Sequence, residues 1–508
     1  MASVNCFKKA AIGIGTVAAI NLFITVLLLI LYGTFDQLVD RMIRASVVIT
    51  PTSSVYSNWV SPDTPIYFSI YLFNITNKDD IEKGSKPRIE QIGPYVYMQR
   101  LTFTLNRNLS VGDPDKDIVI GISIPFVTLA ANMDTETGLS ADEYALMTIF
   151  VEPKLFVETT VTEFLWGYVD PITDACNAFD SKNCPSHKVG VMFGKNGTDD
   201  GPFVIDTGVN DATKLGNVLS YKNKSTLNVW SSDEANQIKG TDGSQVAPGL
   251  RMNSRPFIFA ADLCRSFEML VNGTGKLTNS DKLKVLALSG TPETAQPASV
   301  NPSNKGFCPP LTPGPPCPPA GTFDLSSCRR QGGLRPPIYS SQPYFFGADP
   351  KLRDEVEGLP MPTSDNASTK VFVEPKLGLV VEAYKRLQIT VYVRPSKKMS
   401  EQFKNWTRPT FVPTVWFEEK AVAGADALEV LYTNAYEKPN YGRRILLITM
   451  LVFVSLLLIL LVALAIVLFQ ICYRSPRTGD IIKSGAANSP GVGIFDAKYT
   501  KVAPTNPN

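Results

Sequence analysis

Histidine is nearly missing from this chain of 508 residues, in which His187 is the only one. A Ser-His-Asp or Cys-His catalytic arrangement would have to use that single imidazole, and it lies in a predicted surface loop. The sequence also lacks the Gly-x-Ser-x-Gly motif that presents a nucleophilic serine. We therefore predict that the protein is not an enzyme, and we identify neither catalytic residues nor a cofactor.

An excess of one charge is also absent, because 49 basic residues balance 47 acidic residues along the chain. Without a basic stripe, the sequence gives no reason to expect a nucleic-acid partner. Two stretches, 10–32 and 445–469, contain no charged residue at all. In the second, 20 of the 25 residues are Leu, Ile, Val or Phe, which favours membrane insertion by about 6–12 kcal/mol. Both stretches are long enough to cross a bilayer as helices.

The two apolar stretches predict a two-pass membrane protein whose first helix is an uncleaved signal anchor. Basic residues on both sides of the helix pair leave its orientation open by charge alone. Seven Asn-x-Ser/Thr sequons decide it, because all lie between the helices and indicate a lumenal segment: Asn74, Asn108, Asn196, Asn223, Asn272, Asn366 and Asn405. We expect cytoplasmic tails at 1–9 and 470–508, transmembrane helices at 10–32 and 445–469, and a glycosylated ectodomain at 33–444.

The ectodomain pattern predicts a largely antiparallel β core. Stretches rich in β-branched and aromatic residues, separated by turn-rich segments, predict strands at 66–75, 95–105, 118–127, 257–263 and 387–394. One region is helical in pattern. Ser140 and Glu143 have capping-box spacing, and we expect two short helices within 140–166 that meet at Pro153.

Six of the eight cysteines lie in the ectodomain. An even number in a lumenal domain predicts disulfides, although six cysteines allow fifteen connectivities. Local spacing favours Cys176–Cys184 and Cys308–Cys317, which leaves Cys264–Cys328. A zinc site is the weaker alternative, because the sequence contains no Cys-x-x-Cys.

The remaining two cysteines, Cys6 and Cys472, lie at the predicted cytoplasmic boundaries of the membrane helices. Palmitoylation and a plain reduced thiol are both consistent with that position. In the C-terminal tail, Tyr499 and Val502 frame a Tyr-x-x-Φ pattern, which endocytic adaptors read as a sorting motif. A tetrapeptide of this kind also arises by chance.

Several stretches, in the same order from the first helix to the second, resemble the class B scavenger receptor family. They are GTFDQLVDRMI at 33–43, GPYVY at 93–97, LWGYVDP at 165–171, DLCRSF at 262–267, the spacing of Cys308, Cys317 and Cys328, and KRLQ at 385–388. The resemblance therefore covers nearly the whole ectodomain. It implies an α+β fold: a large ectodomain with an antiparallel β-barrel core and a helical apex, anchored by two transmembrane helices.

The resemblance also implies a function. Members of the family carry fatty acids or sterols through a hydrophobic tunnel in the ectodomain, and ligands dock at the apex. The helical region of this chain corresponds to that apex, where we expect docking by Tyr144, Phe150, Lys154 and Phe156. The family disulfide pattern matches the pairings Cys264–Cys328 and Cys308–Cys317, with Cys176–Cys184 as an added local bond.

The leading hypothesis is thus a plasma-membrane receptor or transporter for fatty acids, sterols or lipoprotein-like particles. An alternative within the family is a trafficking receptor that binds a lumenal enzyme and resides in endosomal or lysosomal membranes. A more distant alternative is a ligand-gated channel with two helices around a glycosylated ectodomain. The second apolar stretch has no ionisable residue to line a pore.

Overall fold

The computed structural model describes residues 2–135, 140–179, 184, 186–308, 313–330, 333–396, 398–399, 403 and 405–474. By its internal contacts the chain forms two units. The first combines residues 1–35 with 440–508, and the second spans residues 36–439. The predicted sorting motif at Tyr499 and Val502 lies outside the described residues.

The first unit contains the two predicted membrane segments. Helix α1 (Ala2–Ser46) includes the first charge-free stretch, and α11 (Lys438–Arg474) includes the second. Both helices are long and apolar enough to cross a membrane. Within this unit they approach closely: a Cβ atom on Gly442 would lie 3.3 Å from the Phe35 ring, and the Arg443 guanidinium lies 5.5 Å from the centre of the Tyr32 ring. Both helices continue beyond the predicted spans 10–32 and 445–469.

The second unit is built on an 11-stranded sheet in which every strand pair is antiparallel. The strands follow the order β10 (Phe257–Ala260), β11 (Arg265–Gly275), β12 (Val285–Gly290), β15 (Lys370–Glu374), β16 (Leu379–Val393), β17 (Thr410–Val422), β1 (Ile66–Ile75), β2 (Ile89–Gln99) and β3 (Phe103–Leu105). Strands β13 (Thr322–Asp324) and β14 (Ile338–Ser341) branch from β16. Among the described residues no strand pairing joins β3 to β10, so the structure does not show the closed barrel that we expected.

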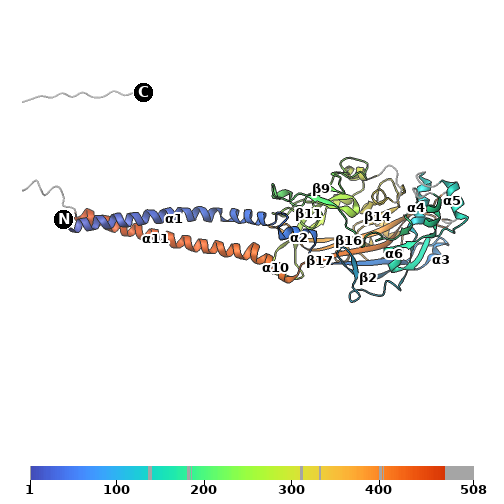
Figure 1. Cartoon of the computed structure of the whole chain (residues 1–508), viewed down its shortest axis with the longest axis horizontal. Coiled ribbons are helices and arrows are strands. Elements are labelled where there is room, and N and C mark those ends of the chain that lie inside the picture. The colour runs from blue at the N-terminus through green and yellow to red at the C-terminus, as the bar shows by residue number, and fades with distance from the viewer. Residues whose placement is uncertain are drawn as a thin grey trace, which may run out of the picture. The chain divides into compact units, whose positions relative to one another are not determined.

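Shorter elements complete this unit. Three further two-stranded sheets pair β4 (Ile118–Ile122) with β5 (Phe156–Thr160), β6 (Tyr168–Val169) with β7 (Lys188–Val189), and β8 (Phe203–Ile205) with β9 (Val218–Tyr221). The helices are α2 (Ser54–Val60), α3 (Lys78–Ile81), α4 (Ile124–Asp134), α5 (Ala141–Thr148), α6 (Val161–Trp166), α7 (Pro171–Phe179), α8 (Lys351–Asp354), α9 (Ser364–Ala367) and α10 (Ala425–Tyr432). Helices α3, α4, α5 and α6 gather at one end of the sheet (Figure 1).

The register of the central strands defines two faces of the sheet. Lys385 lies opposite Glu419, and two residues away Ala383 lies opposite Ala421. Directly opposite residues project to the same side, so we call this side the Lys385 face. The alternating residues, including Arg386 and its opposite residue Glu418, form the Arg386 face.

The sheet curls toward its Lys385 face. Asp262 follows β10 directly, in the 3₁₀ turn Ala261–Leu263, and its carboxylate lies 3.5 Å from Nζ of Lys385 on β16. Four strand spacings separate β10 from β16 in the sheet, which is roughly 19 Å if the sheet were flat. The ion pair therefore requires the β10 edge to fold over the middle of the sheet, as strong strand twist allows.

Two of the strand predictions match the structure closely. The prediction at 66–75 matches β1, and 387–394 falls on β16 apart from its last residue. The stretch 95–105 divides into the end of β2 and all of β3, whereas 257–263 leaves the sheet after Ala260. The prediction at 118–127 is wrong beyond Ile122, because Ser123 accepts a hydrogen bond from the Phe126 amide and begins α4.

The helical prediction over 140–166 needs a similar correction. The capping box of Ser140 and Glu143 begins α5 as expected. Residues 156–160 form strand β5 paired with β4 rather than a second helix. Helix α6 starts only at Val161, where a second capping box between Thr160 and Glu163 satisfies its first turn. The sequence analysis did not identify this second capping box, and it did not predict helices α4 and α7.

Two phenylalanines give a direct test of this packing. Phe126 on α4 has no exposed surface and lies in the largest apolar cluster, whereas Phe150, after α5, is 71% exposed. Phe126→Ala should destabilise the ectodomain by about 3–5 kcal/mol, since it leaves a cavity in a packed core. Phe150→Ala should change the unfolding free energy by less than about 0.5 kcal/mol. Denaturant unfolding of both variants checks this, and equal losses would contradict the assigned core.

Candidate functional site

An apolar patch is exposed on the helical end of the sheet unit. Leu146 on α5 and the two residues after this helix, Ile149 and Phe150, present large hydrophobic side chains to solvent, with 72% of Ile149 exposed. Lys154, in the following loop, is also exposed. Contiguous exposed apolar surface of this kind is typical of a binding surface. We call these four residues the apical patch.

The other two predicted docking residues lie beneath this patch. Tyr144 is buried on α5, within the same apolar cluster as Phe126. Phe156 is half-buried on β5 and packs against that cluster. The exposed side chains thus make Phe150 and Lys154 the better candidates for contact with a ligand, and their docking role stays a prediction.

Helices α4 and α7 hold the apical patch in place. The Ser123 hydroxyl, at the start of α4, donates a hydrogen bond of 2.8 Å to Asp170, just before α7. Asp170 also accepts from the Ile172 amide at 3.0 Å. Burial raises the pKa of the Asp170 carboxyl, and these hydrogen bonds partly offset that effect. The disulfide between Cys176 on α7 and Cys184 closes the adjoining loop.

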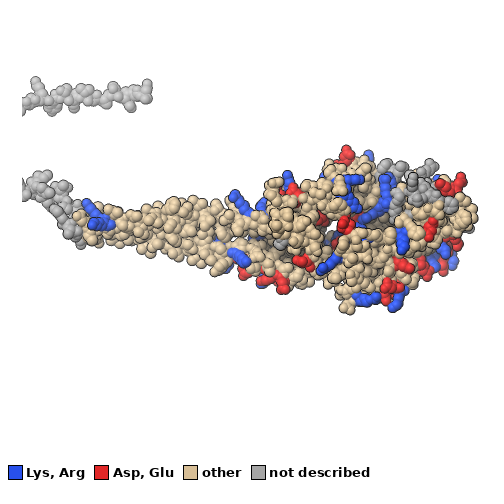
Figure 2. Space-filling view, in the orientation of Figure 1, with Lys and Arg blue, Asp and Glu red and all other residues tan. Residues whose placement is uncertain are grey.

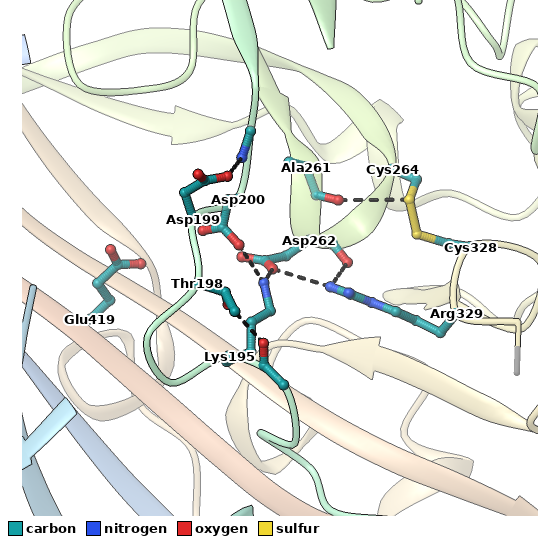
Figure 3. Close-up of polar contacts among 12 residues, drawn as sticks. Lys195, Thr198, Asp199, Asp200, Ala261, Asp262, Cys264, Cys328, Arg329 and Glu419 are labelled. Atoms are coloured by element: carbon teal, nitrogen blue, oxygen red, sulfur yellow. Dashed lines mark hydrogen bonds and ion pairs between the residues drawn. A yellow bond between two sulfur atoms is a disulfide. The ribbon is translucent and has the colours of Figure 1, made fainter. Parts of the chain in front are cut away.

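A second site lies on the Lys385 face, where three cations surround Asp262. Figure 3 shows two of them, Lys195 and Arg329. The Asp262 carboxylate lies 3.1 Å from an Arg329 nitrogen, 3.2 Å from Nζ of Lys195 and 3.5 Å from Nζ of Lys385. Two further carboxylates balance the charge: Lys195 pairs with Asp200 at 2.5 Å, and Lys385 pairs with Glu419 at 3.2 Å. We call these six residues the Asp262 network.

The network fixes the charge state of its members. Burial alone would raise the pKa of Asp262, but Lys385, Lys195 and Arg329 together hold that pKa well below its usual range. Glu419 and Asp262 likewise raise the pKa of Lys385. Asp262 and Lys385 are therefore both charged throughout the range from neutral to endosomal pH.

Water reaches the network although it lies beneath the curled sheet. Burial by the surrounding protein disfavours the charged form of Asp262. Even so, 36% of the Asp262 side chain and 48% of the Lys385 side chain are exposed to solvent. Figure 2 shows a hollow in the middle of the sheet unit, with acidic and basic side chains around it. The Asp262 network thus faces solvent-accessible space on the Lys385 face.

Apolar clusters lie on either side of these charges on the same face. One includes Ile70 and Phe417 from β1 and β17, and the other includes Val271, Leu288 and Val371 from β11, β12 and β15. The register places both clusters on the Lys385 side of the sheet. The face therefore carries apolar, charged and again apolar side chains in succession, and the apolar ones are buried.

The structure contains three disulfides: Cys176–Cys184, Cys264–Cys328 and Cys308–Cys317. These are the pairings that spacing and the family resemblance predict. Cys264 and Cys328 are close in sequence to Asp262 and Arg329, so this disulfide fixes the chain next to the network (Figure 3).

The predicted modification sites are mostly accessible. Six sequon asparagines are exposed, and Asn74 is half-buried on β1, where its side chain accepts a hydrogen bond from the Ile120 amide. Cys6 and Cys472 are free thiols, exposed on α1 and α11. Glycosylation and palmitoylation stay predictions.

Sequence reasoning did not identify the Asp262 network as a site. Asp262 and Lys385 lie in the stretches DLCRSF and KRLQ that support the family resemblance. Lys195, Arg329 and Glu419 carry no such signal. Their contacts with Asp262 and Lys385 depend on the curl of the sheet, which spacing along the chain does not reveal.

Two terminal apolar helices around a large β-rich unit define a two-pass membrane protein. The chain belongs to the CD36 family, whose sequence profile matches residues 17–466. It is 30% identical to mouse lysosome membrane protein 2 over 413 residues, which cover 77% of this chain and 81% of that protein. It is 28% identical to bovine scavenger receptor class B member 1 over 451 residues, which cover 84% and 85% of the two chains.

The Asp262 network predicts a pH-independent contribution to stability. A carboxyl whose pKa is lower in the folded than in the unfolded state stabilises the fold fully above the unfolded pKa, about 3.9, and loses this contribution as pH falls through the folded value. Asp262→Asn should therefore cost about 1–3 kcal/mol, an amount reduced by partial exposure, equally at pH 7.4 and pH 5.0. Asp233→Asn, at an exposed position, is the control. A cost confined to pH 7.4 in denaturant unfolding would contradict this assignment.

Proposed function

We propose that the protein is a lipid-handling membrane receptor rather than an enzyme. In this proposal hydrophobic ligands, such as fatty acids, sterols or lipoprotein-like particles, dock at the apical patch. Lipid then passes through a conduit along the Lys385 face toward the membrane. The observation that carries the proposal is the partial exposure of the Asp262 network beneath a curled sheet.

In this proposal the curl of the sheet completes a barrel around the conduit. Ala383 and Ala421 lie opposite each other on the Lys385 face, next to the Lys385–Glu419 pair, and both are half-buried. Small side chains at this position leave room above the centre of the sheet. The conduit would run beside the flanking apolar clusters, which are buried and would make its surroundings favourable to an acyl chain or sterol ring.

Transfer energetics explain why such a conduit would be useful. Each methylene group exposed to water costs about 0.8 kcal/mol, so a long acyl chain faces a large barrier to leaving a particle. An apolar conduit lowers that barrier. The charged network midway along it would keep the polar head of an amphiphile hydrated or hydrogen-bonded while its tail remains on the apolar walls.

A second candidate function is a trafficking receptor that binds a lumenal protein at the same apical patch. The similarity to lysosome membrane protein 2 favours this candidate. It would use the predicted sorting motif at Tyr499 and place the protein in endosomal or lysosomal membranes, whereas the lipid receptor would act mainly at the plasma membrane.

Occluding the conduit tests the lipid function. Ala421→Trp places an indole on the Lys385 face beside the network, and should reduce uptake of labelled fatty acid or sterol ester to the level of untransfected cells. Ser69→Trp is the control, because Ser69 lies opposite Glu418 on the other face. Both variants must reach the cell surface in equal amounts. Undiminished uptake by Ala421→Trp would refute the conduit.

A charge in the apical patch tests docking. Phe150→Asp should abolish binding of lipid particles to the purified ectodomain, since desolvating a carboxylate against an apolar ligand is costly. Val209→Asp introduces the same charge at a position that is 60% exposed outside this patch, and should leave binding unchanged. Surface plasmon resonance with reconstituted particles gives the comparison. Equal binding by both variants would remove the patch from the docking surface.

A further inference from the structure

A polar cavity lies where the loop before β17 meets the turn between α3 and β2. Its volume is about 150 Å³, enough for about five water molecules at roughly 30 Å³ each. Its wall includes Asn405, Trp406 and Arg408 from the loop, Ser85 and Lys86 from the turn, and Glu355 after α8. The cavity is separate from both the apical patch and the Asp262 network in the residues that form it.

The wall offers hydrogen-bonding groups that the described residues do not fully use. One oxygen of Glu355 accepts from the Phe411 amide at 2.6 Å, whereas its other oxygen has no hydrogen-bond partner in the described part of the chain. Burial raises the pKa of the Glu355 carboxyl. Trp406 is only 7% exposed, and its indole N–H also lacks an acceptor among the described residues. An unmade hydrogen bond from a buried donor destabilises the folded state.

Asn405 in this wall begins a glycosylation sequon, Asn405-Trp406-Thr407. The Asn405 side chain is exposed, and its amide nitrogen, to which a glycan would be attached, donates to the Glu82 carbonyl. An N-linked glycan places its first sugar directly on this nitrogen. The attachment point, the unused acceptor and the aromatic ring therefore belong to one small cavity.

We propose that the first N-acetylglucosamine of a glycan on Asn405 lies in this cavity as a structural part of the ectodomain. A sugar supplies what the wall lacks, because its hydroxyl and acetamide groups both donate and accept hydrogen bonds. They would donate to the unused Glu355 oxygen and provide an acceptor for the Trp406 indole N–H. This inference is independent of lipid transport and requires only that the sheet unit is lumenal.

The test removes the glycan without altering Asn405. Thr407→Ala abolishes this sequon, and Thr407 makes no side-chain hydrogen bond to other described residues. Ser225→Ala abolishes the Asn223 sequon in the same way, at an exposed residue without such a bond, and is the matched control. In full-length protein from a mammalian host, peptide mass spectrometry should find Asn405 occupied. Thr407→Ala should lower the thermal unfolding midpoint by about 2 °C or more, with no shift for Ser225→Ala.

Enzymatic trimming separates the first sugar from the rest of the glycan. An endoglycosidase that leaves a single N-acetylglucosamine on each asparagine should keep the parent's midpoint unchanged. A Glu355→Gln substitution should lower the midpoint of the parent more than that of Thr407→Ala, since the two changes remove parts of one contact. An unoccupied Asn405, equal midpoints for the parent and Thr407→Ala, or a midpoint that falls on trimming would each overturn the proposal.

Discussion

The carboxylate of Asp262 draws Lys195, Arg329 and Lys385 together from three separate stretches of the chain. Lys385 is separated from Asp262 by 123 positions in sequence and by four strand spacings in the sheet. Their contact exists only because the sheet curls. The ion network therefore links the β10 edge to β16 and fixes how strongly the strands between them curl.

Energetically, such a network favours a specific arrangement more than it favours folding itself. Partly buried ion pairs lose in desolvation much of what they gain by attraction, whereas an unpaired charge left behind is costly. The adjacent Cys264–Cys328 disulfide adds stability of a different kind. In the loop-entropy model, closing a loop with a sequence separation of 64 is worth about 4 kcal/mol. Together they hold the β10 edge over the Lys385 face.

This arrangement connects the fold to the proposed function. A flat sheet would expose the apolar clusters that contain Ile70 and Val271 on one open face. The curl instead places the charges between these two buried clusters beneath the folded edge of the sheet, where the proposed conduit would run. An amphiphile has the matching pattern of apolar tail and polar head, and this match is why we propose a lipid ligand.

Local signals in the sequence predicted much of the architecture. The charge-free stretches identified α1 and α11, the alternation over 66–75 predicted β1, and the capping box at Ser140 predicted the start of α5. Errors arose where two local signals compete. Residues 118–127 have the pattern of one strand, but Ser123 ends that strand by capping a helix. Residues 156–160 have a helical pattern, but they form a strand because they pair with β4.

The site was harder to predict for a related reason. Phe150 is exposed and Tyr144 is buried because of how α5 packs on the core. Their spacing in the sequence does not show which of the two is exposed. Likewise, nothing in the sequence distinguishes Glu419 and Arg329 from other charged residues. They join the same network because the sheet curls. Long-range contacts of this type depend on tertiary geometry, which period and propensity do not encode.

The central claim, that the curled sheet encloses a lipid conduit, is tested most directly by what the ectodomain carries. The ectodomain should be purified without detergent from a secreting host and extracted with organic solvent, and the extract analysed by mass spectrometry beside a secreted glycoprotein of similar size. The account predicts fatty acids or sterols bound specifically to this protein and absent from the control. An extract with no lipid beyond that of the control would contradict it.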